Sequence, residues 1–162
     1  MNHPCFGELN THYIKKSPDV IWERELNLNG QIIEAVLWAN QDQILDAAQI
    51  DAFAAMTQDL SGLDAHARAH LLATLEADDE FIAYHTDEVE NFPGVAAIAP
   101  DGEVMPDVFM QAMKLTNIGL WAEAVPDGLV ILDYQIDPEH SDQILAVKIT
   151  DQGKLVAVDW ES

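Results

Sequence analysis

The chain has little cysteine and little positive charge. Its 162 residues include a single cysteine, Cys5, so no internal disulfide can form and an oxidising compartment is not required. Seven Lys and Arg stand against 29 Asp and Glu, which gives a formal net charge of -22 at pH 7. A surface of that sign repels nucleic acid, whose binding requires Lys and Arg to neutralise phosphates, and it repels anionic membranes. The composition therefore argues against nucleic-acid and membrane partners and favours basic proteins or cations.

Long hydrophobic runs and catalytic motifs are also missing. No apolar stretch approaches the ~18 residues that a membrane helix needs, and the first residues lack the basic and apolar regions of a signal peptide. The nucleophile elbow, the phosphate-binding glycine loops and paired Cys-x-x-Cys sites are absent. We therefore expect a cytoplasmic protein, and we lean towards a protein that is not an enzyme.

Two regions have patterns that are typical of β-strands. Residues 20–39 consist of two apolar runs around Asn29 and Gly30, a pair that favours a type I′ hairpin turn. The last third of the chain, residues 128–162, contains three β-branched-rich runs separated by turn residues, which predicts an antiparallel meander. The chain would turn into this meander at residues 126–128, Pro-Asp-Gly.

The middle of the chain is helical in pattern, with apolar residues at three- to five-residue steps. Pro106, at a first-turn position, marks the start of the last helix, and residues 94–105 are either a loop or a minor hairpin. The four predicted helices cover residues 46–60 (ended by Ser61-Gly62), 65–77 (capped by Asp64), 78 to just before Pro93, and 106 to about 119.

Strands that are segregated from helices in sequence indicate the α+β class. We predict one domain spanning residues 1–162. Its antiparallel sheet would combine the N-terminal hairpin with the C-terminal three-stranded meander, because a lone hairpin is marginal in water. The three to four helices between them would pack on one face of that sheet.

His66 and His70 form the most specific candidate for a metal site. Their i, i+4 spacing places both imidazoles on one helix face, as in zinc-binding helices. The Glu that a zinc-protease helix carries beside its first His is missing. His85, Asp87 or Glu88 on the next helix would be the third ligand for zinc or another divalent cation. The alternative is two solvent-facing histidines.

Carboxylates are the candidate residues for contact with a protein partner. They lie at the start and end of the third predicted helix and in the connection between two meander strands, where the Asp-Pro-Glu-His-Ser-Asp sequence fits a turn or a weak Ca²⁺ site. The predicted partner-binding residues are Asp78, Asp79, Glu80, Asp87, Glu88, Glu90, Asp137, Glu139 and Asp142.

Other polar and aromatic residues have ordinary interpretations. Asp133 in the first meander strand is either a solvated residue of an alternating strand or an inward group with an unusual titration. The four tryptophans lie in or beside apolar segments, so core or core-edge packing is expected rather than a recognition surface; they are Trp22, Trp38, Trp121 and Trp160.

Several stretches together resemble a family of small acidic bacterial proteins that is catalogued only as a domain of unknown function. The stretches are Phe6-Gly7-Glu8-Leu9, the Trp22 to Trp38 hairpin around Asn29-Gly30, Ile118-Gly119-Leu120, Leu132-Asp133-Tyr134 with Ser141-Asp142, and Asp159-Trp160-Glu161-Ser162. Related families include immunity proteins that neutralise bacterial polymorphic toxins. The resemblance implies such a role, and it brings no established functional residues.

Two hypotheses for function follow. The first is a non-enzymatic acidic binding protein, an immunity-type inhibitor or adaptor for a basic protein partner, because complementary charge speeds encounter and selects partners. The second is a metal-binding or metal-dependent hydrolytic domain that uses His66 and His70. A homodimer through an exposed edge of the sheet is a further hypothesis.

Overall fold

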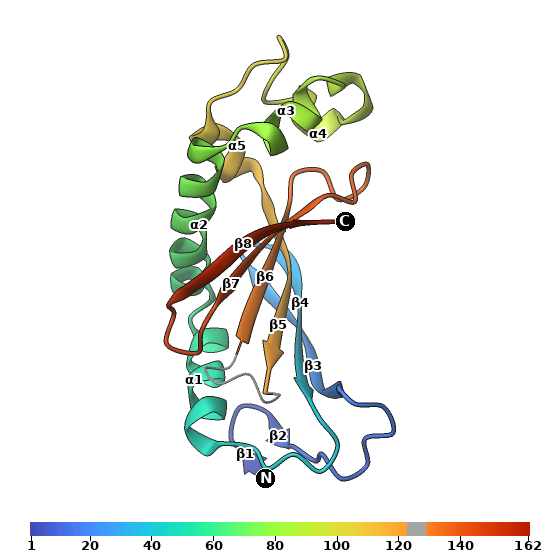
Figure 1. Ribbon diagram of the computed structural model, residues 1–162, viewed down its shortest axis with the longest axis vertical. Helices are drawn as coiled ribbons and strands as arrows, with labels where there is room; N and C mark the ends of the chain where they lie inside the picture. The colour runs from blue at the N-terminus through green and yellow to red at the C-terminus, as the bar shows by residue number, and fades with distance from the viewer. Residues whose placement is uncertain (123–128) are drawn as a thin grey trace.

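The computed structural model describes residues 1–122 and 129–162, so the turn expected at residues 126–128 lies outside the described residues. Figure 1 shows the N-terminus at one end of the long axis and α3, α4 and α5 at the other. The elements in chain order are β1 (Asn2–His3), β2 (Gly7–Glu8), β3 (Asp19–Leu28), β4 (Gln31–Ala39), α1 (Ala47–Gln58), α2 (Leu60–Ala77), α3 (Glu80–Thr86), a 3-10 turn (Val89–Asn91), α4 (Pro93–Ala96), α5 (Pro106–Ala112), β5 (Lys114–Trp121), β6 (Leu129–Gln135), β7 (Ile144–Ile149) and β8 (Leu155–Glu161).

Six of these strands form one mixed sheet in the order β3-β4-β5-β6-β7-β8, and β1 pairs with β2 separately. Neighbouring strands of the large sheet are antiparallel except β4 and β5, which are parallel. A parallel pair needs a long crossover connection, and here the segment that contains α1 to α5 supplies it. In the described residues, the pairing of β4 with β5 is what joins the N-terminal hairpin to the C-terminal strands.

The predictions of the hairpin, the meander and the α+β class are confirmed. Asn29 and Gly30 connect β3 to β4 with φ values of 51° and 88°, the positive angles that a type I′ turn requires. Strands β6, β7 and β8 pair in sequence order as antiparallel neighbours.

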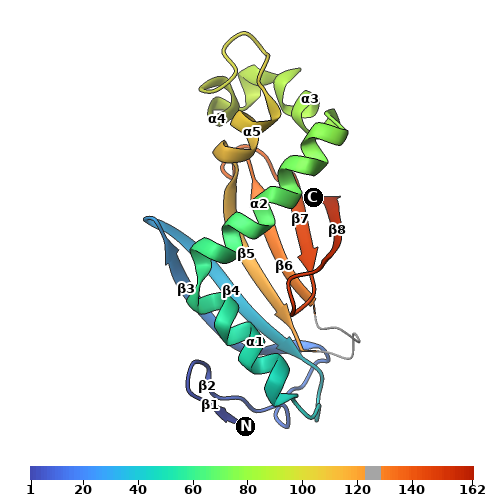
Figure 2. The same ribbon diagram turned by 90° about the vertical axis from the view of Figure 1, so that its left-hand side faces the viewer.

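Helices α1 and α2 lie across one face of the sheet, as Figure 2 shows. Strand residues that point to this face, such as Ile33, Leu37 and Leu132, are fully buried against helix residues that include Phe53 and Leu71. Each such side chain contributes ~1.5–3 kcal/mol by leaving water. No described helix lies on the opposite face, which we call the uncovered face. The described helices also include none that is long and apolar enough to cross a membrane.

The fourth predicted helix is wrong in its second half. Helix α5 ends at Ala112, Met113 is extended with φ -64° and ψ 144°, and the residues that follow form β5. A bulge between Leu115 and Asn117 interrupts the alternation of this strand, so its sequence resembles a helical stripe. Pairing with β4 and β6 on both sides overrides that local pattern. The sheet consequently has a central strand that was not predicted.

The boundary between the first two predicted helices is also wrong. Helix α1 ends at Gln58 rather than at Ser61-Gly62, and α2 begins only two residues later. Asp59 caps α2 by accepting a hydrogen bond of 3.1 Å from the backbone N–H of Gly62, so the cap is not Asp64. Asp64 lies inside α2 and is therefore free to contact the sheet.

The third predicted helix is divided into three short pieces. Helix α3 ends at Thr86, a 3-10 turn follows, and Pro93 begins α4 instead of marking only a stop. This short helix takes up the first residues of the 94–105 segment, and the rest of the segment is a loop without strands. Of the two alternatives for that segment, the loop is confirmed.

Candidate binding surface

The predicted partner-binding carboxylates come from three segments that the fold brings to one end of the molecule. One segment joins α2 to α3, the second follows α3, and the third is the β6–β7 connection; Figure 1 shows α3, α4 and this connection at the same end. Three further exposed carboxylates precede or begin α5. We define the acidic end as Asp78, Asp79, Glu80, Asp87, Glu88, Glu90, Asp101, Glu103, Asp107, Glu139 and Asp142.

Two side-chain contacts fix the β6–β7 connection against the helices. His85 of α3 donates from Nδ1 to the Phe81 carbonyl over 2.9 Å and accepts at Nε2 from the Ser141 hydroxyl over 2.8 Å. The Asp137 carboxylate accepts a hydrogen bond of 2.8 Å from the backbone N–H of Gly94 in α4. A Cβ atom at Gly94 would lie 3.1 Å from that carboxylate, so the absence of a side chain permits this close approach.

His85 is a buried structural residue in this arrangement. Its side chain is fully buried, and its ring packs against those of Phe81, Phe92 and Phe109. Burial lowers the pKa of His85, and the hydrogen bond to Phe81 together with the negative charge of Asp137 only partly opposes that effect. The imidazole is therefore neutral near pH 7, with both ring nitrogens engaged.

Asp137 differs from the other eight predicted partner-binding residues, which are all exposed. It is 7% exposed, and its second carboxylate oxygen lies 2.9 Å from Nδ1 of His140. Burial alone would raise the pKa of Asp137, but the hydrogen bonds from His140 and Gly94 outweigh it and lower the pKa. Its carboxylate is thus used to fix the connection that presents Glu139 and Asp142.

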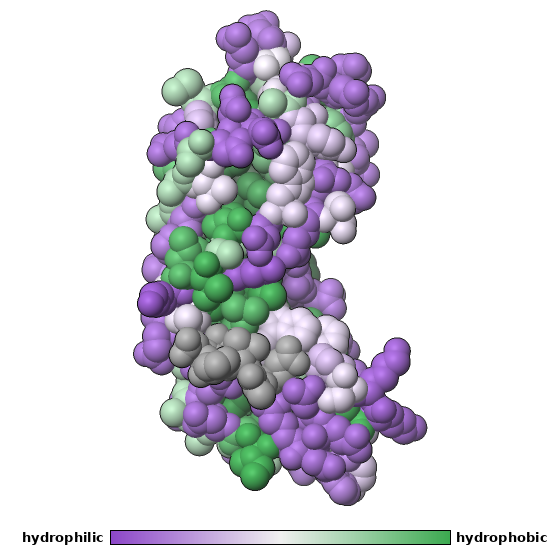
Figure 3. All heavy atoms as spheres, viewed as in Figure 1, coloured by the Kyte–Doolittle hydropathy of each residue, from purple (hydrophilic) through white to green (hydrophobic). Residues whose placement is uncertain are grey.

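Most of the acidic end lies in a long segment of the chain without positive charge. Residues 69–113 contain no Lys or Arg. None of the exposed carboxylates of the acidic end forms an ion pair with a described residue. Hydrophilic residues dominate this end of the molecule in Figure 3. Unpaired charges of one sign produce a field that attracts cationic groups, so the arrangement suits a basic surface.

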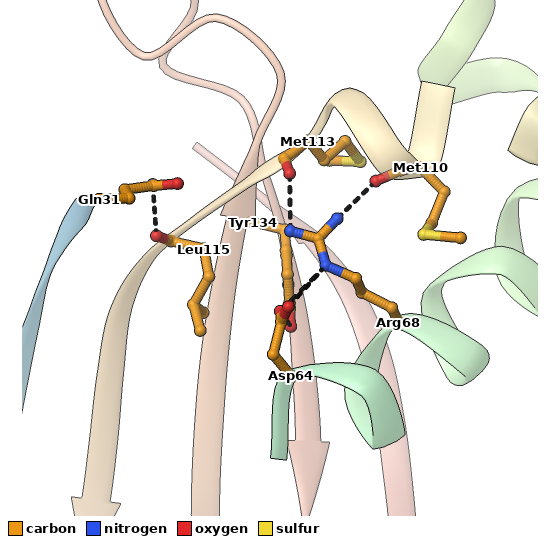
Figure 4. Close-up of polar contacts among 7 residues, drawn as sticks. All are labelled: Gln31, Asp64, Arg68, Met110, Met113, Leu115 and Tyr134. Atoms are coloured by element: carbon orange, nitrogen blue, oxygen red, sulfur yellow. Dashed lines mark hydrogen bonds and ion pairs between the residues drawn. The ribbon is translucent and has the colours of Figure 1, made fainter. Parts of the chain in front are cut away.

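A polar network between α2 and the sheet lies next to the acidic end and contacts the end of α5 (Figure 4). Arg68 donates through Nε to both carboxylate oxygens of Asp64, each over 3.0 Å. The Tyr134 hydroxyl of β6 donates to the same carboxylate over 2.7 Å, and the guanidinium carbon of Arg68 lies 5.1 Å from the centre of the Tyr134 ring. Burial and the adjacent carboxylate raise the pKa of Tyr134, so its hydroxyl stays protonated and donates.

Arg68 also binds the C-terminal end of α5. Its two terminal nitrogens donate to the carbonyls of Met110 and Met113, over 2.7 and 2.9 Å. These carbonyls lie at the C-terminal end of α5, where they lack partners within the helix. Gln31 of β4 donates to the carbonyl of Leu115 two residues later, over 2.7 Å. The junction between α5 and β5 is thus held from both sides. Sequence reasoning missed this role, although Asp64 and Arg68 have the i, i+4 spacing of an ion pair.

The metal-site candidates are only partly brought together. The rings of His66 and His70 lie 5.0 Å apart, centre to centre, on the exposed side of α2. His66 donates through Nε2 to the carbonyl of Gly153 over 2.6 Å. His85 is separate from this pair, and among the described residues no three His, Cys, Asp or Glu side chains are grouped to hold a metal ion. The chain thus presents two imidazoles where a zinc site needs at least three ligands.

The uncovered face carries a tryptophan pair. Trp38 and Trp121 are register partners on β4 and β5, and their half-buried rings stack 5.0 Å apart with an interplanar angle of 6°. A Cβ atom at Gly119 would lie 3.0 Å from Nε1 of Trp121, so this glycine leaves room for the ring. Burial raises the pKa of Asp133 on the same face, against a hydrogen bond from Asn117. Asp133 therefore has a polar partner on this face, and so do Asp159 and Glu161, which share Lys148.

Comparison with known proteins adds no relative. No protein-family model, no curated protein and no solved structure matches the chain. Its function is consequently inferred from its own residues.

Proposed function

We propose that this chain is a non-enzymatic acidic binding protein, an inhibitor or adaptor of the immunity type that binds a basic protein. The observation that carries the proposal is the acidic end, where exposed carboxylates from four separate segments lie together without described cationic partners. Charge complementarity of this kind accelerates association and disfavours wrong partners. The proposal keeps the cytoplasmic location that the single cysteine favours.

Side-chain hydrogen bonds hold the segments that present the charges. Two hydrogen bonds hold the β6–β7 connection against the helices: Ser141 bonds to His85 of α3, and Asp137 bonds to Gly94 of α4. Arg68 holds the end of α5. A charged surface on a fixed framework loses little conformational entropy when it binds, and this favours recognition of a partner over a purely solubilising role.

The test is capture of partners from a bacterial lysate at low and at moderate salt, followed by mass spectrometry of retained proteins. We expect one basic protein in stoichiometric amount, with retention that falls as salt rises because exposed charges are screened. The informative variant is Asp87→Lys, Glu88→Lys, Glu90→Lys, which should abolish retention.

The matched control changes three exposed glutamates of the β3–β4 hairpin by the same total charge: Glu23→Lys, Glu25→Lys, Glu34→Lys. This control should retain the partner. Equal loss in both variants would mean that net charge alone governs binding, and an empty capture with the wild type at both salts would contradict the proposal.

A further inference from the structure

Strand β8 is an unprotected edge of the sheet. It is the last strand in the sheet order, so one side of its backbone has no ladder partner among the described residues. Its exposed side chains include Val156 (57% exposed) and Trp160 (42% exposed). Figure 3 shows hydrophobic residues gathered over β7 and β8. Exposed apolar edges of this kind are templates for pairing with another strand.

The other edge strand, β3, is protected in the usual way. Its middle residues, Glu23, Arg24 and Glu25, are all exposed and charged. Charged side chains on an edge prevent unwanted pairing. In β8 the run from Leu155 to Val158 is apolar, and the charged residues Asp159 and Glu161 come only at its end, so the two edges of the sheet differ in the placement of charge.

A groove lies beside β8 on the helix side of the sheet. It has a volume of about 150 Å³ and is lined by apolar side chains that include Leu75, Phe81 and Trp160. Asp78 and Glu80, both part of the acidic end, also line it. The Trp160 ring makes an edge-to-face contact with Phe81, another residue of the lining, with the ring centres 5.1 Å apart.

The two faces of β8 carry different side chains, and this difference indicates which side chains an added strand would need on each of its faces. Trp160 pairs in register with buried Leu145 and faces the helix side, so its neighbours Asp159 and Glu161 face the uncovered side. These two carboxylates share Lys148, whose Nζ lies 2.9 Å from each, so one negative charge remains. A strand added beside β8 would therefore meet apolar surface on one face and negative charge on the other.

We propose that β8 binds an extended segment of a basic protein by strand addition, with alternate apolar side chains towards the groove and alternate Lys or Arg towards Asp159 and Glu161. Backbone hydrogen bonds would supply affinity, and the alternation would supply specificity. A second copy of the chain is a poorer occupant, because two antiparallel β8 strands would bring the same carboxylates together on one face. The inference rests on the proposed function only for the sign of the partner's charge.

The experiment uses two ten-residue peptides as probes, one with Lys and Val alternating and one with the same residues in two blocks of five. Binding to the full chain is measured by fluorescence of the tryptophans and by amide hydrogen exchange. We expect the alternating peptide to bind at least about ten times more tightly than the block peptide, and to protect the amides of β8. Equal affinity of the two peptides would overturn the proposal.

Two matched variants locate the site. Val156→Lys adds a cation to the exposed edge of β8, and Ile32→Lys makes the same change at a 55% exposed position on β4, four strands away in the sheet. The first should weaken binding of the alternating peptide about ten-fold or more and the second less than about two-fold. Equal weakening in both would show that the attraction is only electrostatic, which overturns strand addition and leaves the proposed function standing.

Two further readouts separate the remaining outcomes. A ten-residue lysine peptide tests the acidic end alone: if it fails to bind while the alternating peptide binds, the inference holds and the proposed function fails. If the alternating peptide fails while the lysine peptide binds, only the inference fails. Sedimentation of the free chain tests self-pairing, since a dimer that Val156→Lys dissociates would make a second copy the occupant and overturn the proposal.

Discussion

The two ends of the molecule differ in the partners of their carboxylates. At the N-terminal end, Asp51 lies 3.0 Å from Nε2 of His3, and Asp42 lies 2.9 Å from Nδ1 of His12. At the acidic end, the exposed carboxylates have no such partners among the described residues. Net charge alone does not reveal this difference. The difference lies in where the ion pairs are: both of these contacts with histidine lie near the N-terminus, and none involves a carboxylate of the acidic end.

The largest expected effect comes from removing the residue that supports the acidic end. Arg68→Ala would leave the partly buried Asp64 carboxylate and the carbonyls of Met110 and Met113 without their donor. We expect a loss of about 3 kcal/mol in the free energy of unfolding, measured by urea denaturation. Amide exchange should accelerate at the α5–β5 junction before it does so in β1 and β2.

The control for this substitution is Arg24→Ala on the edge strand β3. Arg24 is exposed and lies 5.5 Å from the centre of the Trp22 ring. Its loss should cost less than about 1 kcal/mol. Similar costs for the two variants would mean that the Arg68 network does not hold the acidic end.

The pH dependence of stability should contain a contribution from His85. Because the folded state lowers the pKa of this residue, the unfolded chain takes up its proton first as the pH falls below about 6.5. The stability is fully present above that pH and is lost as the pH falls through the lower pKa of the folded state. The unfolding midpoint of His85→Gln should therefore fall less steeply than that of the wild type between pH 7 and pH 5. Parallel profiles of variant and wild type would contradict this assignment.

Single charge reversals should have opposite signs at the two ends. Glu88→Lys relieves repulsion at the acidic end and should raise the thermal midpoint by about 1–2 °C. Asp51→Lys removes the contact with His3 and should lower it by about 1–2 °C. Both shifts should shrink in 0.5 M NaCl, at roughly the ionic strength where surface charges are screened within a few ångströms. Shifts of the same sign would remove the distinction between the two ends.

The smallest effect should come from metal. Two imidazoles at His66 and His70 bind a cation weakly, so equimolar zinc should raise the thermal midpoint by less than about 1 °C. The measurement pairs calorimetry with metal analysis of protein purified without a histidine tag. Stoichiometric zinc that disappears in His66→Ala, His70→Ala would instead support the metal-dependent hypothesis.

Local sequence predicts the elements whose partners are near in the chain. The Asn29-Gly30 hairpin and the C-terminal strands follow from turn chemistry and from runs of β-branched residues. Strand β5 was missed because its pattern is interrupted by a bulge and its identity is set by β4, with which it pairs across a long connection. Register between distant segments is a tertiary property that no local window contains.

The exposure of the chosen carboxylates follows from the sequence, whereas the contacts that hold their segments do not; a role of these residues in binding stays a prediction. Eight of the nine chosen carboxylates are exposed, because charged residues at helix ends and turns are solvated. Asp137 was indistinguishable from them in sequence, since only the approach of Gly94 makes it a buried acceptor. The contact of His85 with Ser141 and that of Arg68 with α5 depend likewise on segments far apart in the chain.

The parallel pairing of β4 with β5 has a consequence for biosynthesis. The ribosome completes β4 at Ala39 and does not reach the start of β5 at Lys114 until about 75 residues later. At roughly 5–20 residues per second, this interval lasts ~4–15 s. During that time the hairpin has emerged while the hydrogen-bonding edge of β4 has no partner. The nascent chain therefore passes through a stage in which β4 is a temporary edge, and a folding helper that recognises extended strands would act at that stage.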